Sequence, residues 1–100
     1  MEEKINLNSV CVHSRNVVAR DIQGEFIIVP VTSGIEDLDD KVFTLNRTGQ
    51  LIWGELDGKK SLKTVAGRLT SQLAASREEI EKDVLGLSRE LFERKLLVEV

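Results

Sequence analysis

Cys11 and His13 are the residues best suited to chemistry, because each is the single member of its type in this 100-residue chain. On an extended segment the two side chains would lie on the same face, two positions apart. A structural zinc site takes four protein ligands and a catalytic zinc site takes three, so this pair supplies half of a metal site at most. The simpler interpretation is a surface histidine beside a small, partly buried cysteine, and no metal or other cofactor is predicted.

A second group of reactive side chains lies in the acidic segment Ser33–Lys41, which carries Glu36, Asp37, Asp39 and Asp40. The spacing of these carboxylates does not match that of a calcium-binding loop, so a solvated acidic loop is the simpler interpretation. The sequence also contains no glycine-rich phosphate loop and no recognisable nucleophile motif. The chain is therefore predicted not to be an enzyme.

Composition limits the function classes further. With 41% hydrophobic and 31% charged residues, the chain has the composition of one globular domain. The net charge of −3 argues against a nucleic-acid-binding protein, because neutralising phosphates normally requires a basic surface. No apolar run is long enough to span a membrane, and the first residues lack the features of a signal peptide. A single cysteine fits a reducing compartment, so a cytoplasmic location is predicted.

A helix-turn-helix pattern occupies residues 45–73. Asn46 is predicted to cap the first helix and Ser61 to cap the second, because each can accept a hydrogen bond from a free backbone N–H of the first turn. The pair Asp57-Gly58 is predicted to end the first helix in a tight turn, with glycine supplying the left-handed residue. Two short helices joined in this way must turn sharply against each other.

A longer third helix is predicted to start at the capping box formed by Ser76 and Glu79 and to run to about Arg94. Residues at helical spacing should form its core stripe: Ile80, Val84, Leu87 and Leu91. A second stripe lies about a quarter-turn round the helix and consists of Glu81, Leu85, Ser88 and Phe92. Leu85 and Phe92 widen the apolar face beyond the needs of one seam, so they either pack in the core or line a groove.

Strands are predicted before the helices. Residues 17–22 and 25–29 flank Gln23-Gly24, a pattern typical of a tight β-hairpin. A short third strand, Val42–Leu45, should present Phe43 and Leu45 on one face and Thr44 on the other. Its outer edge would carry unpaired backbone groups that an extended peptide can pair with by strand addition. The predicted peptide-binding residues line a groove between this strand and the third helix: Lys41, Val42, Phe43, Thr44, Leu45, Glu81, Leu85, Ser88 and Phe92.

Several short segments resemble the PqqD family, which is named after pyrroloquinoline quinone biosynthesis protein D. They are residues 20–25 (RDIQGE), Leu45-Asn46, Gly49, Ile52-Trp53 and Leu56-Asp57-Gly58, within a match over about residues 17–98. The resemblance implies an α+β fold, a small winged helix-turn-helix domain with a three-stranded antiparallel sheet followed by three helices. We therefore expect this domain in residues 17–100, preceded by an N-terminal extension of residues 1–16.

The resemblance also implies a function. Members of the family are peptide chaperones, also called RiPP recognition elements, which bind the leader of a ribosomally made precursor peptide. They present it to a modifying enzyme, often of the radical S-adenosylmethionine (radical SAM) type. The leader would pair with the strand at residues 42–45 against the last helix, and no catalytic residues are implied. Because many relatives serve other peptides, synthesis of the quinone cofactor itself is not implied.

Two alternatives come from other function classes. A DNA-binding winged helix would use the basic residues of the turn and second helix, namely Lys59, Lys60, Lys63 and Arg68. The acidic residues of the third helix would repel phosphates and argue against it: Glu78, Glu79, Glu81, Asp83, Glu90 and Glu93. The other alternative is a structural subunit that forms a homodimer through its sheet edge.

Overall fold

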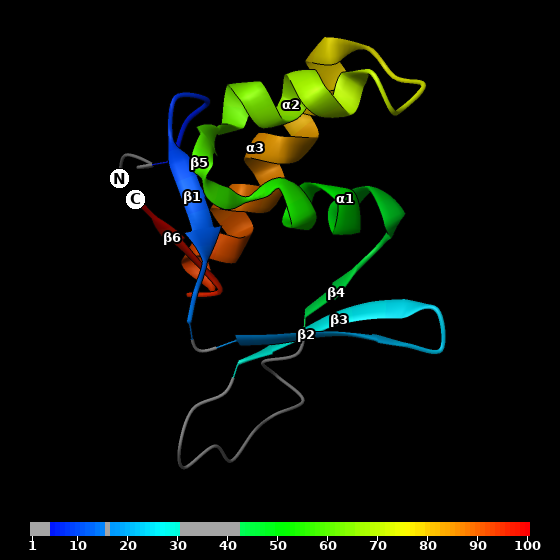
Figure 1. Ribbon diagram of the computed structural model, residues 1–100, viewed down its shortest axis with the longest axis vertical. Coiled ribbons are helices and arrows are strands. Elements are labelled where there is room, and N and C mark those ends of the chain that lie inside the picture. The colour runs from blue at the N-terminus through cyan, green and yellow to red at the C-terminus, as the bar shows by residue number, and fades with distance from the viewer. Residues whose placement is uncertain (1–4, 16, 31–42) are drawn as a thin grey trace.

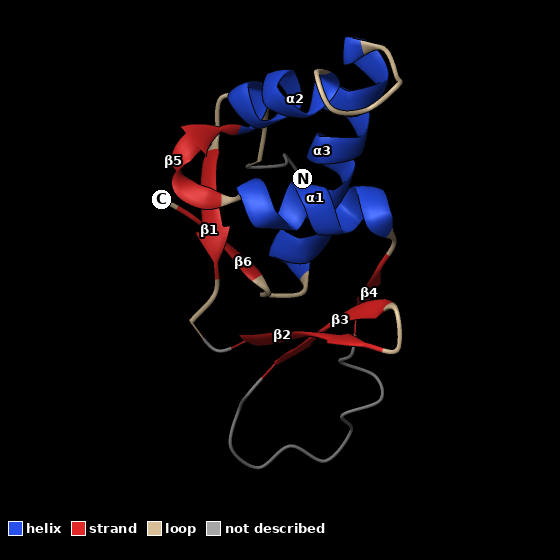
Figure 2. Ribbon diagram, turned by 45° about the vertical axis from the view of Figure 1, so that its right-hand side comes forward, coloured by secondary structure: helices blue, strands red, loops and turns tan. Residues whose placement is uncertain are grey.

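The computed structural model describes residues 5–15, 17–30 and 43–100 of the chain. Three helices and two antiparallel sheets of three strands make up this part, which confirms the predicted α+β class (Figure 1). We call the sheet with the order β2-β3-β4 the wing sheet and the sheet with the order β5-β1-β6 the lateral sheet. Figure 2 shows the wing sheet at one end of the molecule and the lateral sheet beside the helices.

The wing sheet forms as predicted. Strands β2 (Val17–Ile22) and β3 (Glu25–Pro30) pair along their whole length around the turn Gln23-Gly24. Gln23 and Gly24 have φ values of 54° and 84°, the left-handed conformations that a type I′ hairpin turn requires at both central positions. The third strand, β4 (Phe43–Leu45), pairs with β3 and leads directly into the first helix.

The helix starts also match the predictions. Helix α1 (Arg47–Glu55) is capped by Asn46, whose side-chain oxygen accepts a 2.8 Å hydrogen bond from the Gly49 N–H. Ser61 caps helix α2 (Leu62–Thr70), and Ser76 with Glu79 forms the complete capping box of helix α3 (Arg77–Glu93). These local motifs satisfy backbone donors that would otherwise be unpaired at each helix start.

The predicted tight turn between α1 and α2 is wrong. Helix α1 ends at Glu55 with Leu56 as its C-cap, and residues 57–61 form strand β5 (Asp57–Ser61) rather than a turn. Gly58 does adopt a positive φ of 80°, but it does so inside β5, where the register against β1 (Val10–His13) shifts. The backbone of this segment pairs with a strand some forty-five residues earlier, and local turn propensity does not contain that information.

The lateral sheet makes residues before position 16 part of the fold. Strand β1 is its central strand, with β5 on one side and β6 (Leu97–Glu99) on the other. Ile5 and Cys11 are buried in the same core as the helices. The predicted boundary between an extension of residues 1–16 and a domain of residues 17–100 remains a proposal. Through β1, part of the predicted extension pairs with β5 and β6.

The core lies between the three helices and the inner faces of both sheets. Its members include Trp53, Leu56, Leu69 and Leu97. On α3 the buried residues are Ile80, Val84, Ser88 and Leu91. Leu87, which we predicted in the core stripe, is only half-buried, so the buried face of α3 is rotated toward Ser88. No helix in the described ranges combines the length and the apolar character that crossing a membrane would take.

Replacing Gly58 with alanine is expected to destabilise the protein, whereas replacing Gly86 with alanine should stabilise it. A Cβ at Gly58 would lie 3.1 Å from Cβ of Val12, and its left-handed backbone costs a non-glycine residue about 1–2 kcal/mol. Gly86 lies inside α3 with no atom within 4 Å of an added Cβ, and alanine there gains about 1 kcal/mol in helix propensity. Thermal unfolding of both variants shows whether each substitution lowers or raises the unfolding temperature. A Gly58→Ala variant as stable as wild type would contradict the strain at β5.

Candidate functional site

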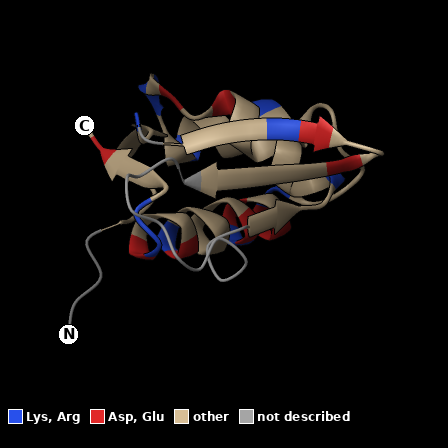
Figure 3. Ribbon diagram, turned by 90° about the horizontal axis from the view of Figure 1, so that it is seen from below, with Lys and Arg blue, Asp and Glu red and all other residues tan. Residues whose placement is uncertain are grey.

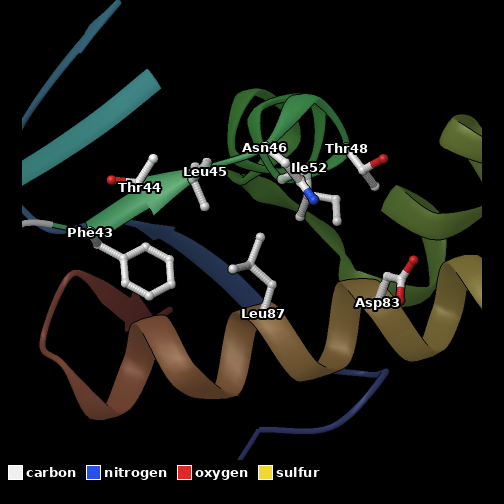
Figure 4. A pocket seen from close by; sticks show the side chains of 9 residues that line it. Phe43, Thr44, Leu45, Asn46, Thr48, Ile52, Asp83 and Leu87 are labelled. Carbon is white, nitrogen blue, oxygen red and sulfur yellow. Dashed lines mark hydrogen bonds between the residues drawn. The ribbon is translucent and has the colours of Figure 1, made fainter. Parts of the chain in front are cut away.

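The site is built around the outer edge of β4. This strand ends the wing sheet, so within the described part of the chain no strand pairs with its second edge. Strand β4 is the last strand of the wing sheet and leads into α1, and helix α3 passes opposite it (Figure 4). An exposed strand edge presents N–H and C=O groups that water or another chain must satisfy.

The hairpin turn determines which backbone groups of β3 point toward β4. In a type I′ turn the Glu25 N–H bonds to the Ile22 carbonyl, so these two residues form a hydrogen-bonded pair. In an antiparallel ladder such pairs alternate with non-bonded pairs, and successive residues point their backbone groups to opposite sides. Phe26 and Ile28 therefore direct their N–H and C=O away from β2 and toward β4.

The same alternation places the free groups of β4. Leu45 is paired with Phe26, and Phe43 is paired with Ile28, so Leu45 and Phe43 direct their backbone groups toward β3. Thr44 lies between them and points the other way. Its N–H and C=O consequently face the open edge, and a peptide residue placed opposite Thr44 can bond to both.

A pocket of about 320 Å³ lies beside this edge. Its apolar lining comes from three elements, with Phe43 and Leu45 from β4, Ile52 from α1 and Leu87 from α3. Figure 4 shows the side chains of Phe43, Leu45 and Leu87 directed into the space between strand and helix. The pocket is at the lower end of ligand-pocket sizes, which suits one or two side chains of a peptide better than a large ligand.

Polar groups border the apolar lining. Asn46 and Thr48 stand at the start of α1, and Asp83 stands on α3 one turn before Leu87 (Figure 4). Thr44 has an exposed side chain, as the predicted alternation requires, while Leu45 is buried. At the opposite end of the groove the Arg94 guanidinium lies 4.9 Å from the centroid of the Phe43 ring.

The structure brings only part of the predicted site together. Phe43, Thr44 and Leu45 line the pocket, whereas Lys41 and Val42 lie outside the described residues. The helix residues Glu81, Leu85, Ser88 and Phe92 do not line it.

Helical geometry explains why the second stripe misses the groove. At about 100° per residue, Leu85 and Phe92 are about 160° and 140° away from Leu87 around α3. Ser88 is fully buried, Glu81 pairs with Arg77, and Leu85 and Phe92 pack against the core. Peptide contact by these four residues stays a prediction, which the geometry of the pocket does not favour.

Sequence reasoning missed Leu87 and Asp83 as site residues. The spacing of Leu87 fits the predicted core stripe, and Asp83 is one of several acidic residues of the helix, so the sequence pattern alone indicates neither as a site residue. The signal that could have found them is the flank of the apolar face: Asp83 and Leu87 are four residues apart and so lie on one side of α3.

Cys11 and His13 take structural roles. Burial, together with the nearby Glu99 carboxylate, raises the pKa of the Cys11 thiol to about 11, so the thiol stays protonated. The His13 ring stacks on Trp53 at 3.7 Å between centroids, and its Nε2 lies 2.6 Å from the Trp53 carbonyl oxygen. This histidine is half-buried rather than a surface residue, and no group of three metal-ligating side chains occurs among the described residues.

The basic side expected for a DNA-binding protein is partly neutralised. Lys60 Nζ lies 3.3 Å from Glu55 Oε1 and 2.7 Å from Asp57 Oδ2, and Arg68 Nε lies 2.8 Å from Glu55 Oε1. Hydrogen bonds from the Lys60 side chain and the Lys59 backbone lower the pKa of Asp57 to about 2, which keeps this carboxylate ionised. Figure 3 shows acidic and basic positions interspersed in the view onto the wing sheet.

Solved structures with this fold include two described as complexes with leader peptides. A lasso peptide synthetase B1 complexed with the leader peptide is 22% identical, with a TM-score of 0.72 over 89% of this chain and 98% of that chain. TbiB1 in complex with the TbiA(beta) leader peptide is 23% identical, with a TM-score of 0.68 over 86% and 93% of the two chains.

A third similar structure is the PqqD truncation of Methylobacterium extorquens PqqCD, described as a functional and stand-alone RiPP recognition element. It is 17% identical, with a TM-score of 0.74 over 96% of both chains. No curated protein matches the chain. The family model of coenzyme PQQ synthesis protein D (PqqD) matches residues 25–97, which include β3, β4, β5, the three helices and the first residue of β6. The chain therefore belongs to the PqqD family.

Proposed function

We propose that this protein is a RiPP recognition element: it binds the leader of a ribosomally made precursor peptide as an added strand beside β4. It presents that peptide to a modifying enzyme and performs no chemistry itself. Ribosomally made peptides arise in the cytoplasm, which is where the protein would meet them.

The observation that carries this proposal is the open edge at Thr44 beside the apolar pocket. The edge offers one donor and one acceptor in the geometry of an antiparallel ladder, and the pocket lies next to it. In strand addition the main chain supplies affinity, and pockets for alternate side chains supply sequence preference. Here β4 supplies the edge, and β4, α1 and α3 together supply the pocket.

The comparisons support the proposal from a separate direction. Two structures with the same fold are described as holding leader peptides, and this chain covers more than nine-tenths of each. The described relatives belong to a lasso peptide synthetase and to a PqqCD protein, so one fold occurs with different peptide pathways. We therefore propose a peptide-modifying enzyme as the partner, with a radical SAM enzyme as the first candidate, and leave the product open.

The test is a titration with the leader segments of short candidate precursor peptides identified among the neighbouring genes. We expect one-to-one binding with a Kd in the micromolar range or tighter, measured by calorimetry, and no binding of a scrambled peptide of the same composition. Equal heats with the natural and the scrambled leader would contradict specific strand addition.

A DNA-binding measurement distinguishes the peptide-binding function from the alternative DNA-binding function. A mixed-sequence duplex is expected to bind only weakly and to be released by salt, because Lys60 and Arg68 are already paired with acidic residues. Fluorescence anisotropy across a salt series measures this. Micromolar affinity for the duplex at physiological salt would replace the peptide-binding proposal by the DNA-binding one.

A further inference from the structure

Asp83 is the one charged residue among those that line the pocket beside β4. Three other acids of α3 have partners: Glu79 belongs to the capping box, Glu81 pairs with Arg77, and Glu90 pairs with Arg94. Asp83 has no ion pair among the described residues. A carboxylate without a partner therefore stands at the border of an otherwise apolar pocket.

Among the described residues, no other charged side chain lines this pocket or pairs with the Asp83 carboxylate. Arg94 lies over Phe43 at the far end of the groove, and its guanidinium pairs with Glu90 at 3.1 Å. Arg47 lines a second pocket on the side of the hairpin turn, which shares three residues of β4 and the α1 cap with the first but not Asp83. Lys82 directly precedes Asp83 on α3 and lines a second hollow together with Glu79 and Asp83, but it does not line the pocket beside β4 and forms no ion pair with Asp83 in the described part of the chain. Among the described residues, Asp83 is therefore the one charged side chain that a peptide in this pocket would meet.

The spacing on α3 matches the spacing on an added strand. Leu87 and Asp83 are four residues apart, which is about 6 Å along a helix. On a β-strand, side chains on the same face recur every two residues, at about 6.5–7 Å. A peptide that places one side chain in the pocket at Leu87 therefore brings the side chain two positions away to Asp83.

We infer that Asp83 is a specificity-determining residue: it selects leaders that carry Lys or Arg two positions from the apolar residue that fills the pocket. The inference rests on the proposed function, since it names the chemistry of the peptide that this site would accept. Either order of the two residues satisfies the geometry, depending on the direction of the added strand.

The effect belongs to selectivity more than to affinity. Asp83 is exposed, and ion pairs between exposed groups typically change binding by about 1.5- to 5-fold. Complementary charge at the border of an interface acts mainly on partner choice and on the association rate. A readout that compares many peptides at once is therefore more sensitive than one Kd.

The experiment is selection from a display library of random twelve-residue peptides on the immobilised full-length protein. Wild type should enrich peptides with an apolar residue and a Lys or Arg two positions from it. Asp83→Asn should keep the apolar residue and lose the basic preference, and Asp83→Lys should favour Asp or Glu at that position. Glu78→Lys makes the same change in net charge about 140° away around α3 and should select as wild type does.

The outcomes separate the inference from the function on which it rests. Enriched peptides with an apolar anchor and a charge preference that does not respond to Asp83→Lys would overturn the role of Asp83 and leave peptide binding intact. A shift that Glu78→Lys reproduces would overturn it too, because net charge would then be the cause. Failure of the wild type to enrich any peptide over a blank surface would overturn the proposed function itself.

Discussion

Replacing Thr44 with proline is expected to abolish leader binding while the domain stays folded. Proline removes the N–H that faces the open edge of β4, and its ring occupies the position where a peptide carbonyl would approach. A buried peptide carbonyl left without its donor costs about 1–3 kcal/mol, and with the ring blocking its approach we expect a loss in affinity on the order of 100-fold. Calorimetric titration with the leader peptide measures the loss.

The fold should tolerate this change because the missing N–H takes no part in the wing sheet. Proline is accepted on edge strands when its nitrogen faces solvent. Leu45→Pro is the contrasting variant, since the Leu45 N–H faces β3 and its loss breaks the ladder to Phe26. We expect thermal unfolding near the wild-type temperature for Thr44→Pro and a clear decrease for Leu45→Pro.

Thr44→Val serves as the side-chain control. It keeps the N–H and nearly the shape of the exposed threonine, so it should bind the leader as wild type does. A folded Thr44→Pro variant with unchanged affinity would place the peptide elsewhere on the molecule. An equal loss in Thr44→Val would assign the effect to the hydroxyl group rather than to the backbone.

The backbone groups of β3 that face β4 follow from a local motif, which makes this part of the wing sheet predictable from sequence. Gln23-Gly24 specifies a two-residue turn, and the turn determines the register of β2 and β3, whereas the register of β4 against β3 comes from the structure. The caps at Asn46, Ser61 and Ser76 are local in the same sense, because a side chain satisfies a backbone N–H of the next turn.

The errors arise where distant segments decide the outcome. Strand β5 exists because Val10–His13 pairs with it, and nothing between Leu56 and Ser61 indicates that partner. The buried face of α3 also differs from the prediction, because the packing of the helix against other elements buries Ser88. Its Oγ has no hydrogen-bond partner among the described residues. A hydrophobicity pattern excludes a serine from the core stripe, so the predicted stripe assigned that place to Leu87.

The rotation of α3 has a direct test in two leucines one turn apart. Leu91 is fully buried, and Leu91→Ala is expected to lower the free energy of unfolding by about 2–5 kcal/mol. Leu87 is half-buried at the pocket, so Leu87→Ala should cost roughly 1 kcal/mol, because less area leaves contact with the core. Urea unfolding measured for both variants gives the two values.

Binding should rank the same two leucines in the opposite order. Leu87→Ala enlarges the pocket and removes its contact with the apolar side chain of the leader, so a loss of about 10-fold or more is expected. Leu91→Ala, examined at a temperature where it is folded, should bind within about threefold of wild type, since its side chain lies on the core side of α3. A Leu87→Ala variant that loses as much stability as Leu91→Ala and binds the leader normally would show that Leu87 is a core residue. It would also contradict the proposal that α3 contacts the peptide.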